Sequence, residues 1–491
     1  MPFKSIFKIF LLPFFLFFIP EKAFSQYIGG AKNETAKSFC HLVDSYYLIG
    51  STRSYGEGSE DVYTIKINPA LNTEWERTWG YPSQDAGMQI IPTKDNKLVY
   101  TAFSWESPGP GFREDLFVSK TDLNGEEIWT THFGGSDTDR PFDIIQTNDS
   151  GYVITGLRKV IGSLGGSFVL KLNKGGNLEF QKSFVLSYKA IGKSIAEGPN
   201  SNLFLVVENN SFIDNNVRSS EFKGSTPTEV WLFRLGSSGN EIWRKKISGT
   251  GFNLASEIKI HNDKIYIVGS SEENTKGNFD MSVTELNLDG DVLNRYFFGG
   301  PNFEYGKTLD FDDQDNWYIT GTTGGGKTNL FPKMYVVKAN PDGSVMWEKE
   351  YGSDYSNYGV KGQVINPDKI ALLGTSTVQE GTDFNQEIYF VIINSIGDVI
   401  REVNEVDSGV TSTFGPMVNF YPNPTQGKIT LQWSDKLVSV PTLFVYDLRG
   451  KTLIEEKLRS NNVQFEFEKP GIYSYRLVFD NQLFYGKIQV N

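Results

Sequence analysis

The sequence predicts an all-β protein in which a seven-bladed β-propeller with four-stranded blades precedes a small β-sandwich. A passage of roughly fifty residues recurs through residues 26–406, and each copy holds four short runs rich in β-branched and aromatic residues. A glycine turn follows the first run of nearly every copy. The last copy is incomplete, and its missing half lies at the N-terminal end of the repeat region.

Residues 1–25 predict a signal peptide. Two lysines precede an apolar run, Ile9–Ile19, and the small residues Ala23 and Ser25 mark a cleavage site. We expect cleavage between Ser25 and Gln26. The apolar run is shorter than the ~20 residues of a membrane-spanning helix, and no later run approaches that length. The mature chain is therefore predicted to be exported without a transmembrane segment.

The copies share a clear internal order. In the best-defined copy a first run, Asp115–Thr121, leads through the turn Asn124-Gly125 to a second run with Trp129. Large second-run residues are expected to fill the interfaces between neighbouring blades, although the fifth copy has Asn294 there. The first runs begin at Asp61, Asp115, Ser167, Val230, Asp280, Met334 and Glu387.

The incomplete copy predicts how the ring closes. Its first two runs lie in Glu387–Val406, and the other two are Ser38–Val43 and Tyr46–Gly50. We expect two strands from each end to complete one blade, which would leave no exposed sheet edge. A β-solenoid is the alternative for such a period, and the split copy favours the closed ring.

The composition changes after the repeats. Residues 407–417 form a polar linker, and residues 418–491 hold alternating strand-like runs separated by turn residues, which is typical of a small β-sandwich. Four motifs follow in order: Tyr421-Pro-Asn-Pro-Thr-Gln-Gly427, Asp447-Leu-Arg-Gly-Lys451, Gly471-Ile-Tyr473 and Lys487-Ile-Gln-Val490.

This tail resembles the C-terminal sorting domain (type A) of proteins exported by the type IX secretion system of Bacteroidetes. The resemblance implies that the type IX export machinery is a partner, and that the protein is secreted or held on the outer cell surface. The propeller units likewise resemble the glycine-rich repeats that are often joined to this domain.

Composition limits the functions to consider. The formal net charge is −12 and no basic block is present, so nucleic acid is not an expected partner. The one cysteine, Cys40, excludes an internal disulfide and a thiolate metal cluster. The three histidines, His41, His132 and His261, fall in different repeat units, so neither a metal site nor a nucleophilic triad is expected.

The turn between the second and third runs has one position that carries a polar residue in all copies but the third, which has Ala190. We call this position the polar register. A ring of these residues could bind Ca²⁺ or a cationic ligand, and caps of their own turns are the alternative. Exchange of Asp, Glu and Asn at one register favours caps, so no cofactor is predicted and Ca²⁺ stays an open alternative. The residues are Glu34, Asp85, Asp139, Asn253, Glu304 and Asn357.

Two further motifs are interpreted as structural. Gly321–Thr328 fits the phosphate-loop pattern, but Phe331-Pro332 follows it where a helix is required, so we expect an inter-blade loop. The acidic cluster lacks the glycine and distal glutamate of an EF-hand and predicts a solvated turn. Its members are Asp310, Asp312, Asp313 and Asp315.

We expect a surface or extracellular binding module for a protein or glycan. Its ligand would lie on long loops at one end of the ring, namely Ser104–Arg113, Asn209–Thr228 and Gly321–Lys333. A polysaccharide hydrolase or lyase that uses channel carboxylates is the alternative, and a purely structural role is a third hypothesis. Sequence alone nominates no catalytic residue.

Overall fold

The computed structural model of the protein divides into two compact units, residues 1–404 and 405–491, and each is described by itself. The residues it describes are 27–490 without the following segments: 57, 70, 106–113, 135–137, 160–164, 188, 211–227, 274–278, 325–330, 381–382, 403–417, 422–426, 434–441, 447–451, 459–461, 468 and 480–481. The expected signal peptide and its Ser25–Gln26 cleavage site lie outside the described residues.

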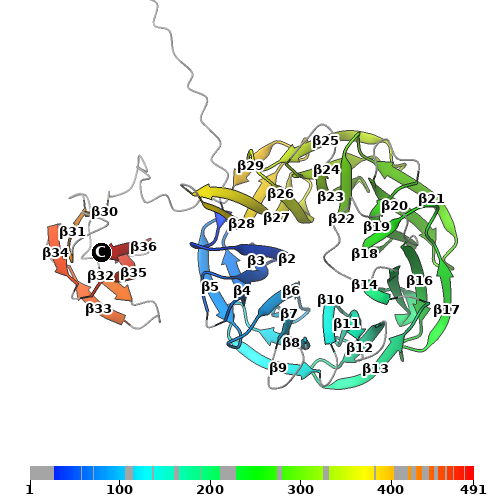
Figure 1. Ribbon diagram of the computed structural model, residues 1–491, viewed down its shortest axis with the longest axis horizontal. Helices are drawn as coiled ribbons and strands as arrows, with labels where there is room; N and C mark the ends of the chain where they lie inside the picture. Colours follow the sequence, from blue (N-terminus) through cyan, green and yellow to red (C-terminus); the bar gives the residue numbers. More distant parts are fainter. Residues whose placement is uncertain are drawn as a thin grey trace, which may run out of the picture. The chain divides into compact units, whose positions relative to one another are not determined.

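The first unit is a ring of seven antiparallel sheets, the blades, as predicted (Figure 1). Blade 1 holds β2 (Glu34–Leu42), β3 (Ser45–Thr52), β4 (Asp61–Ile67) and β5 (Thr73–Trp79). Blade 2 holds β6 (Asp85–Pro92), β7 (Leu98–Ser104), β8 (Asp115–Thr121) and β9 (Glu127–Phe133). Blade 3 holds β10 (Thr138–Gln146), β11 (Tyr152–Lys159), β12 (Gly166–Leu172) and β13 (Leu178–Phe184).

The remaining blades repeat this order. Blade 4 holds β14 (Lys189–Glu197), β15 (Leu203–Asn210), β16 (Glu229–Leu235) and β17 (Glu241–Lys246). Blade 5 holds β18 (Asn253–His261), β19 (Lys264–Ser271), β20 (Asp280–Asn287) and β21 (Val292–Phe298). Blade 6 holds β22 (Phe303–Phe311), β23 (Trp317–Gly324), β24 (Lys333–Ala339) and β25 (Val345–Tyr351). Blade 7 holds β26 (Asn357–Asn366), β27 (Lys369–Glu380), β28 (Asp383–Ile393) and β29 (Val399–Glu402).

The blades are out of phase with the predicted units by two strands. The first strand of each blade lies nearest the ring axis and the fourth lies on the outside (Figure 1). A predicted unit therefore supplies the outer two strands of one blade and the inner two of the next. The reason is that the connection after the second run crosses between blades, whereas the connection from the fourth run to the next first run is a hairpin within one sheet.

Ring closure is simpler than expected. Strands from both ends do meet, because β1 (Tyr27–Ile28) pairs with β28 through Tyr27 and Tyr389 and through Ile28 and Ile388. The expectation of two N-terminal strands in the closing blade is wrong, since β2 and β3 belong to blade 1 and β26–β29 are all C-terminal. Side-chain packing of blade 1 on blade 7, for example of Phe39 on Phe390, completes the junction.

The predicted role of the large second-run residues is confirmed. Each lies on the outer strand and covers the turn glycine of the next blade, as Trp129 covers Gly176. In blade 5, which has Asn294 at this position, the packing differs locally as expected, because Tyr296 two residues later covers Gly343. The other pairs are Trp75–Gly125, Phe180–Gly239, Trp243–Gly290 and Trp347–Gly397.

The second unit is a small pair of sheets. One has the order β30-β31-β34 and the other β33-β32-β35-β36. Apolar side chains of both sheets, such as Leu431 and Leu443, form a common core. The strands are β30 (Val418–Tyr421), β31 (Lys428–Trp433), β32 (Thr442–Tyr446), β33 (Thr452–Lys457), β34 (Asn462–Glu466), β35 (Gly471–Phe479) and β36 (Gln482–Val490).

Candidate functional site

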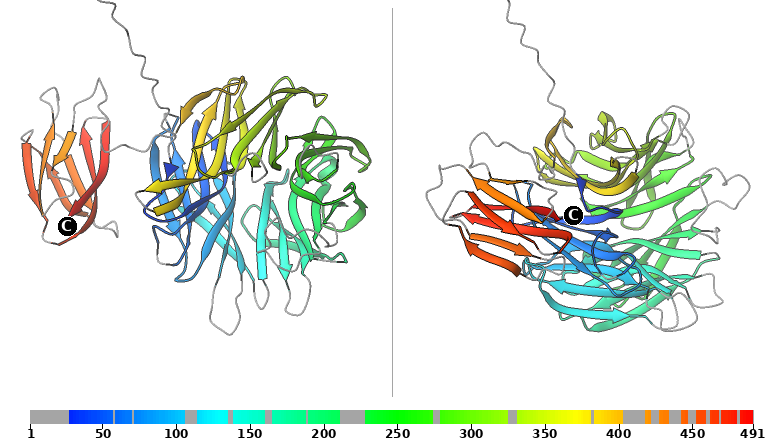
Figure 2. Two further views of the ribbon diagram at one scale, coloured as in Figure 1. Left: turned by 45° about the horizontal axis from the view of Figure 1, so that its top comes forward. Right: turned by 60° about the vertical axis from the view of Figure 1, so that its left-hand side comes forward.

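One face of the ring carries the long connections, and we call it the loop face. Successive strands of a blade are antiparallel, so the connections between blades and those from a second to a third strand leave on the same side (Figure 2). The three long loops predicted to hold a ligand join β7 to β8, β15 to β16 and β23 to β24. Most of their residues lie outside the described part of the chain.

The polar residues of the shared register begin the inner strands at the loop face and are buried. Four of them accept a hydrogen bond from the backbone N–H four residues earlier, as Asp85 Oδ2 does from Tyr81 at 2.8 Å. The other three donors are Gly30 to Glu34, Gly300 to Glu304 and Ser353 to Asn357. These four side chains thus each hold their own connection, and a ligand-binding role for this register stays the untested alternative.

In the two glutamates of this set the second carboxylate oxygen is occupied as well. Glu34 and Glu304 accept hydrogen bonds at 2.8 Å and 2.6 Å from the hydroxyls of Thr52 and Thr323 on the adjacent strand. Burial raises the pKa of Glu304, although the hydrogen bonds from Thr323 and Gly300 oppose the change.

The two other members use different partners. Asp139 forms an ion pair with Arg158, and Asn253 accepts from Ser271 Oγ at 2.8 Å. Among the described residues, no group of three or more His, Cys, Asp and Glu side chains is placed to hold a metal ion.

The acidic cluster lies at the end of β22 and on the hairpin to β23, and three of its four members have separate partners. Asp312 accepts from the backbone N–H groups of Gln314 and Asn316, which closes the turn. Asp310 pairs with Lys259 at 2.7 Å, and Asp315 Oδ1 lies 2.7 Å from His261 Nε2. The carboxylates are thus used in the turn and between blades 5 and 6.

The histidines and Cys40 do not meet. His41, His132 and His261 lie in blades 1, 2 and 5, and His261 stacks on Phe311 with ring centroids 4.0 Å apart. Cys40 is 3% exposed, and burial raises the pKa of its thiol to about 12. A thiol at that pKa is not a nucleophile at neutral pH.

The segment that fits the phosphate-loop pattern is not followed by a helix. Residues 321–324 end strand β23, residues 325–330 lie outside the described part, and β24 begins at Lys333. The segment belongs to the hairpin connection from β23 to β24 within blade 6, so its expected place between blades is wrong. The cause is the offset of two strands between the predicted units and the blades.

Sequence reasoning missed a feature of the inner strands. All seven carry a β-bulge at the same register, and in six of them the preceding residue is Gly or Ala. The four glycines at this position face a close approach of the neighbouring strand or blade. A Gly or Ala two positions after the polar register was the available signal. The bulged residues are Lys37, Met88, Phe142, Lys193, Ser256, Lys307 and Val360.

Side chains directly after the bulges tie the blades together around the axis. Asp143 Oδ2 accepts from Ser194 Oγ at 2.6 Å and from the Ile195 N–H at 3.0 Å in the next blade. Glu257 accepts from the Leu309 N–H at 2.8 Å in the same way. Burial raises the pKa of both carboxyl groups. These carboxylates near the axis have a structural use that glycoside hydrolysis does not require.

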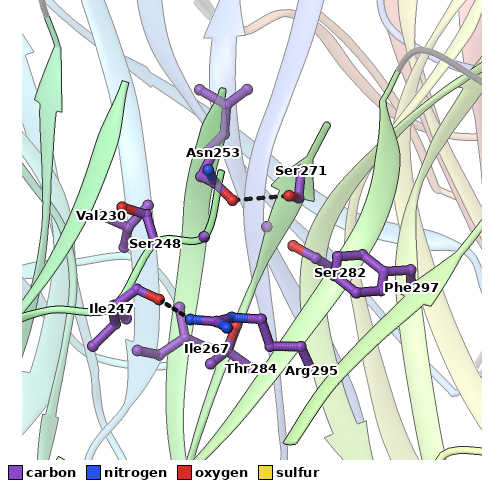
Figure 3. Close-up of a pocket in the computed structure, with 13 residues that line it drawn as sticks. Val230, Ile247, Ser248, Asn253, Ile267, Ser271, Ser282, Thr284, Arg295 and Phe297 are labelled. Carbon is purple, nitrogen blue, oxygen red and sulfur yellow. Dashed lines mark hydrogen bonds between the residues drawn. The ribbon is translucent and has the colours of Figure 1, made fainter. Parts of the chain in front are cut away.

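A small cavity lies between blades 4 and 5 (Figure 3). Its volume is about 20 Å³, room for about one water molecule. Arg295 donates to the Ile247 carbonyl at 2.8 Å at its edge, and Asn253 accepts from Ser271 (Figure 3). The cavity is too small for an organic ligand.

An aromatic cluster is exposed on the loop face of blades 6 and 7. Phe331 and Tyr355 have ring centroids 6.2 Å apart, and Tyr355 and Phe384 have centroids 5.4 Å apart. Phe331 is 45% exposed and Phe384 is 56% exposed. Nearby on the innermost strand, Tyr358 is also exposed. Neighbouring exposed rings of this kind are typical of recognition surfaces.

Residues 419–491 match the family of secretion system C-terminal sorting domains. The chain therefore carries a type IX C-terminal sorting domain, and the protein is secreted or located at the cell surface. No helix in the described part of the chain has the length and hydropathy that a membrane crossing requires. No curated protein matches the sequence.

Several solved structures are similar in fold. The beta-propeller domain of the Trilobed protease from Pyrococcus furiosus has 9% identity and a TM-score of 0.43, over 79% of this chain and 99% of that one. Pyrococcus horikoshii acylaminoacyl peptidase has 10% identity and a TM-score of 0.44, over 83% of this chain. Puromycin hydrolase has 9% identity and a TM-score of 0.45, over 82% of this chain. This chain spans 59% of each of the last two.

Proposed function

We propose that the protein is an exported binding module that recognises a protein or glycan through the loop face of its propeller. The aromatic cluster of Phe331, Tyr355 and Phe384 is the observation that carries this function. Phe331 lies in the connection before β24, Tyr355 in the connection before β26 and Phe384 at the start of β28. Two of the three rings, those of Phe331 and Phe384, are exposed. Aromatic rings held on a rigid scaffold contribute strongly to binding because they lose little conformational entropy.

The location of the protein supports this function. A secreted or surface protein meets polysaccharides and the surfaces of other proteins, and rim loops on a rigid ring are a common place for recognition. The long connections of blades 2, 4 and 6 leave from the same face. A ligand on the aromatic cluster would therefore lie on the same face of the ring as these connections.

The test is a glycan-array and protein-ligand screen with the full-length protein. Phe384→Ala should weaken binding about tenfold or more, as expected for loss of an exposed aromatic anchor. Ile396→Ala is the matched control, because Ile396 is 60% exposed on the opposite face of the same blade. Equal effects of the two substitutions would contradict a site on the loop face.

The alternative is a polysaccharide hydrolase or lyase that uses channel carboxylates. Asp143 and Glu257 are the candidates near the axis with raised pKa values, and both hold the backbone of the next blade. Incubation of each bound polysaccharide with the protein, followed by analysis of its chain length, separates the two functions. Shortened chains would support the enzyme, and unchanged chains support the binding module.

A further inference from the structure

Three of the seven bulged residues are lysines from three different blades: Lys37 in blade 1, Lys193 in blade 4 and Lys307 in blade 6. The bulges occur at one register of strands that surround the ring axis (Figure 1), and this shared register places the three residues at a similar depth. Each is three or four residues below the loop-face end of its strand, a depth of about 10 Å. We call them the channel lysines.

The surroundings of these lysines show that they share one space. Lys37 and Lys307 are exposed although they lie on the innermost strands, so water reaches the space that these strands enclose. Desolvation by the surrounding strands lowers the pKa of Lys307 to about 8, and the nearby ammonium groups of Lys193 and Lys37 add to the shift, which Glu208 opposes. Desolvation and repulsion among the ammonium groups thus act together on Lys307.

The channel lysines are only partly paired with carboxylates, since one of them has an ion pair and Glu60 acts on Lys37 from a greater distance. Among the described residues, neither Lys37 nor Lys307 has a hydrogen bond or an ion pair. Lys193 lies 3.6 Å from Glu208, whose other oxygen accepts from the Ala255 N–H at 2.8 Å. The lysines thus outnumber the one carboxylate paired with them, in a protein of net charge −12.

We propose that Lys37, Lys193 and Lys307 form an anion-binding site in the channel, which receives one carboxylate, sulfate or phosphate group. Three ammonium groups that approach from different directions match the oxygen atoms of such a group, and a confined site with low-dielectric walls strengthens the attraction. An anion also removes the repulsion among the lysines. The anion site itself does not depend on the proposed function. The inference rests on the proposed function only where it assigns the bound carboxylate, sulfate or phosphate group to a ligand at the loop face.

Aromatic rings beside a cationic channel would favour an acidic ligand over a neutral one. Lys193 Nζ lies 5.3 Å from the ring centroid of Phe142, the bulged residue of blade 3, so an aromatic ring lies beside one of the ammonium groups. The same anionic group can belong to a free ion or to a chain of acidic sugars. The experiment therefore uses both sources.

The first measurement is titration of the full-length protein with sodium sulfate against sodium chloride at constant ionic strength, by isothermal titration calorimetry. Lys37→Met and Lys307→Met should each weaken sulfate binding at least tenfold, since methionine keeps the apolar stem and removes the charge. Lys174→Met is the control, because Lys174 is exposed on the opposite face of blade 3. Absence of saturable binding, or an equal loss in the Lys174 variant, would overturn the proposal.

The pH dependence gives a second readout that a structural role would not move. Sulfate keeps its charge above pH 4, so a change between pH 7 and pH 9 reports on the protein. Lys307, which faces Lys193, Lys37 and Glu208, loses its proton near pH 8, and sulfate affinity should fall about tenfold over this range. In Lys307→Met the fall should largely disappear. A fall of unchanged size in this variant would contradict the assignment.

A competition experiment separates this inference from the proposed function. The binding of polygalacturonate, an acidic polysaccharide, and of dextran, a neutral one, is measured with and without sulfate as the competitor. Sulfate that binds through the lysines, without any polysaccharide or protein ligand at the loop face, supports the anion site and contradicts the proposed function. The opposite outcome is a loop-face ligand whose binding is lost in Phe384→Ala but is unaffected by sulfate and by Lys307→Met. That outcome supports the proposed function and contradicts the anion site.

Discussion

Replacement of Gly176 by alanine tests how neighbouring blades fit together. Gly176 has φ = +81° in the turn between β12 and β13, and an added Cβ would lie 2.7 Å from Cε3 of Trp129 in blade 2. The left-handed conformation costs an alanine about 1–2 kcal/mol. Displacement of a packed ring costs about 1–3 kcal/mol more. Gly176→Ala should therefore lower the free energy of unfolding by roughly 2–5 kcal/mol.

The adjacent residue provides the control. Gly175 has no positive φ, and its added Cβ would come no closer than 3.4 Å to a side chain of the same turn. Gly175→Ala should change stability by no more than about 0.5 kcal/mol. Both variants are compared by urea unfolding of the full-length protein, followed by near-ultraviolet circular dichroism, with slopes checked for equality.

A double-mutant cycle identifies the cause of the loss. In a Trp129→Ala background the clash is absent, so Gly176→Ala should cost only the conformational term of about 1–2 kcal/mol. The difference between the two backgrounds is the energy of the contact between blades. If Gly176→Ala costs the same in both backgrounds, the steric argument is refuted.

Two further predictions concern buried groups. Cys40, whose thiol has a pKa of about 12, should resist a thiol reagent at pH 8 in the native protein and react fully in urea, and rapid native labelling would contradict its burial. Asp143→Ala should lower the free energy of unfolding by about 3 kcal/mol, because it leaves the donors Ser194, Ile195 and Gln89 without their acceptor. Urea unfolding measures this loss, and a change below about 0.5 kcal/mol would show that the hydrogen bonds around the axis contribute little.

The candidate site shows which kind of residue can be located from a sequence. The polar register was visible because its members recur at one place in the repeat, and the interchange of Asp, Glu and Asn suggested hydrogen-bonding roles. The channel lysines were not visible, because four other blades have Met, Phe, Ser or Val at the same place. A feature that varies from copy to copy gives no periodic signal, even when its members converge on one axis.

The sequence by itself determined the all-β class, the seven blades and the C-terminal sorting domain, because strand patterns, turn glycines and short motifs are local properties. Only the tertiary structure decided the phase of the blades and the closure by β1 alone, since these depend on pairing between distant strands. It alone also decided the grouping of Lys37, Lys193 and Lys307. Side chains far apart in the chain meet there because the closed ring turns the same strand of every blade toward one axis.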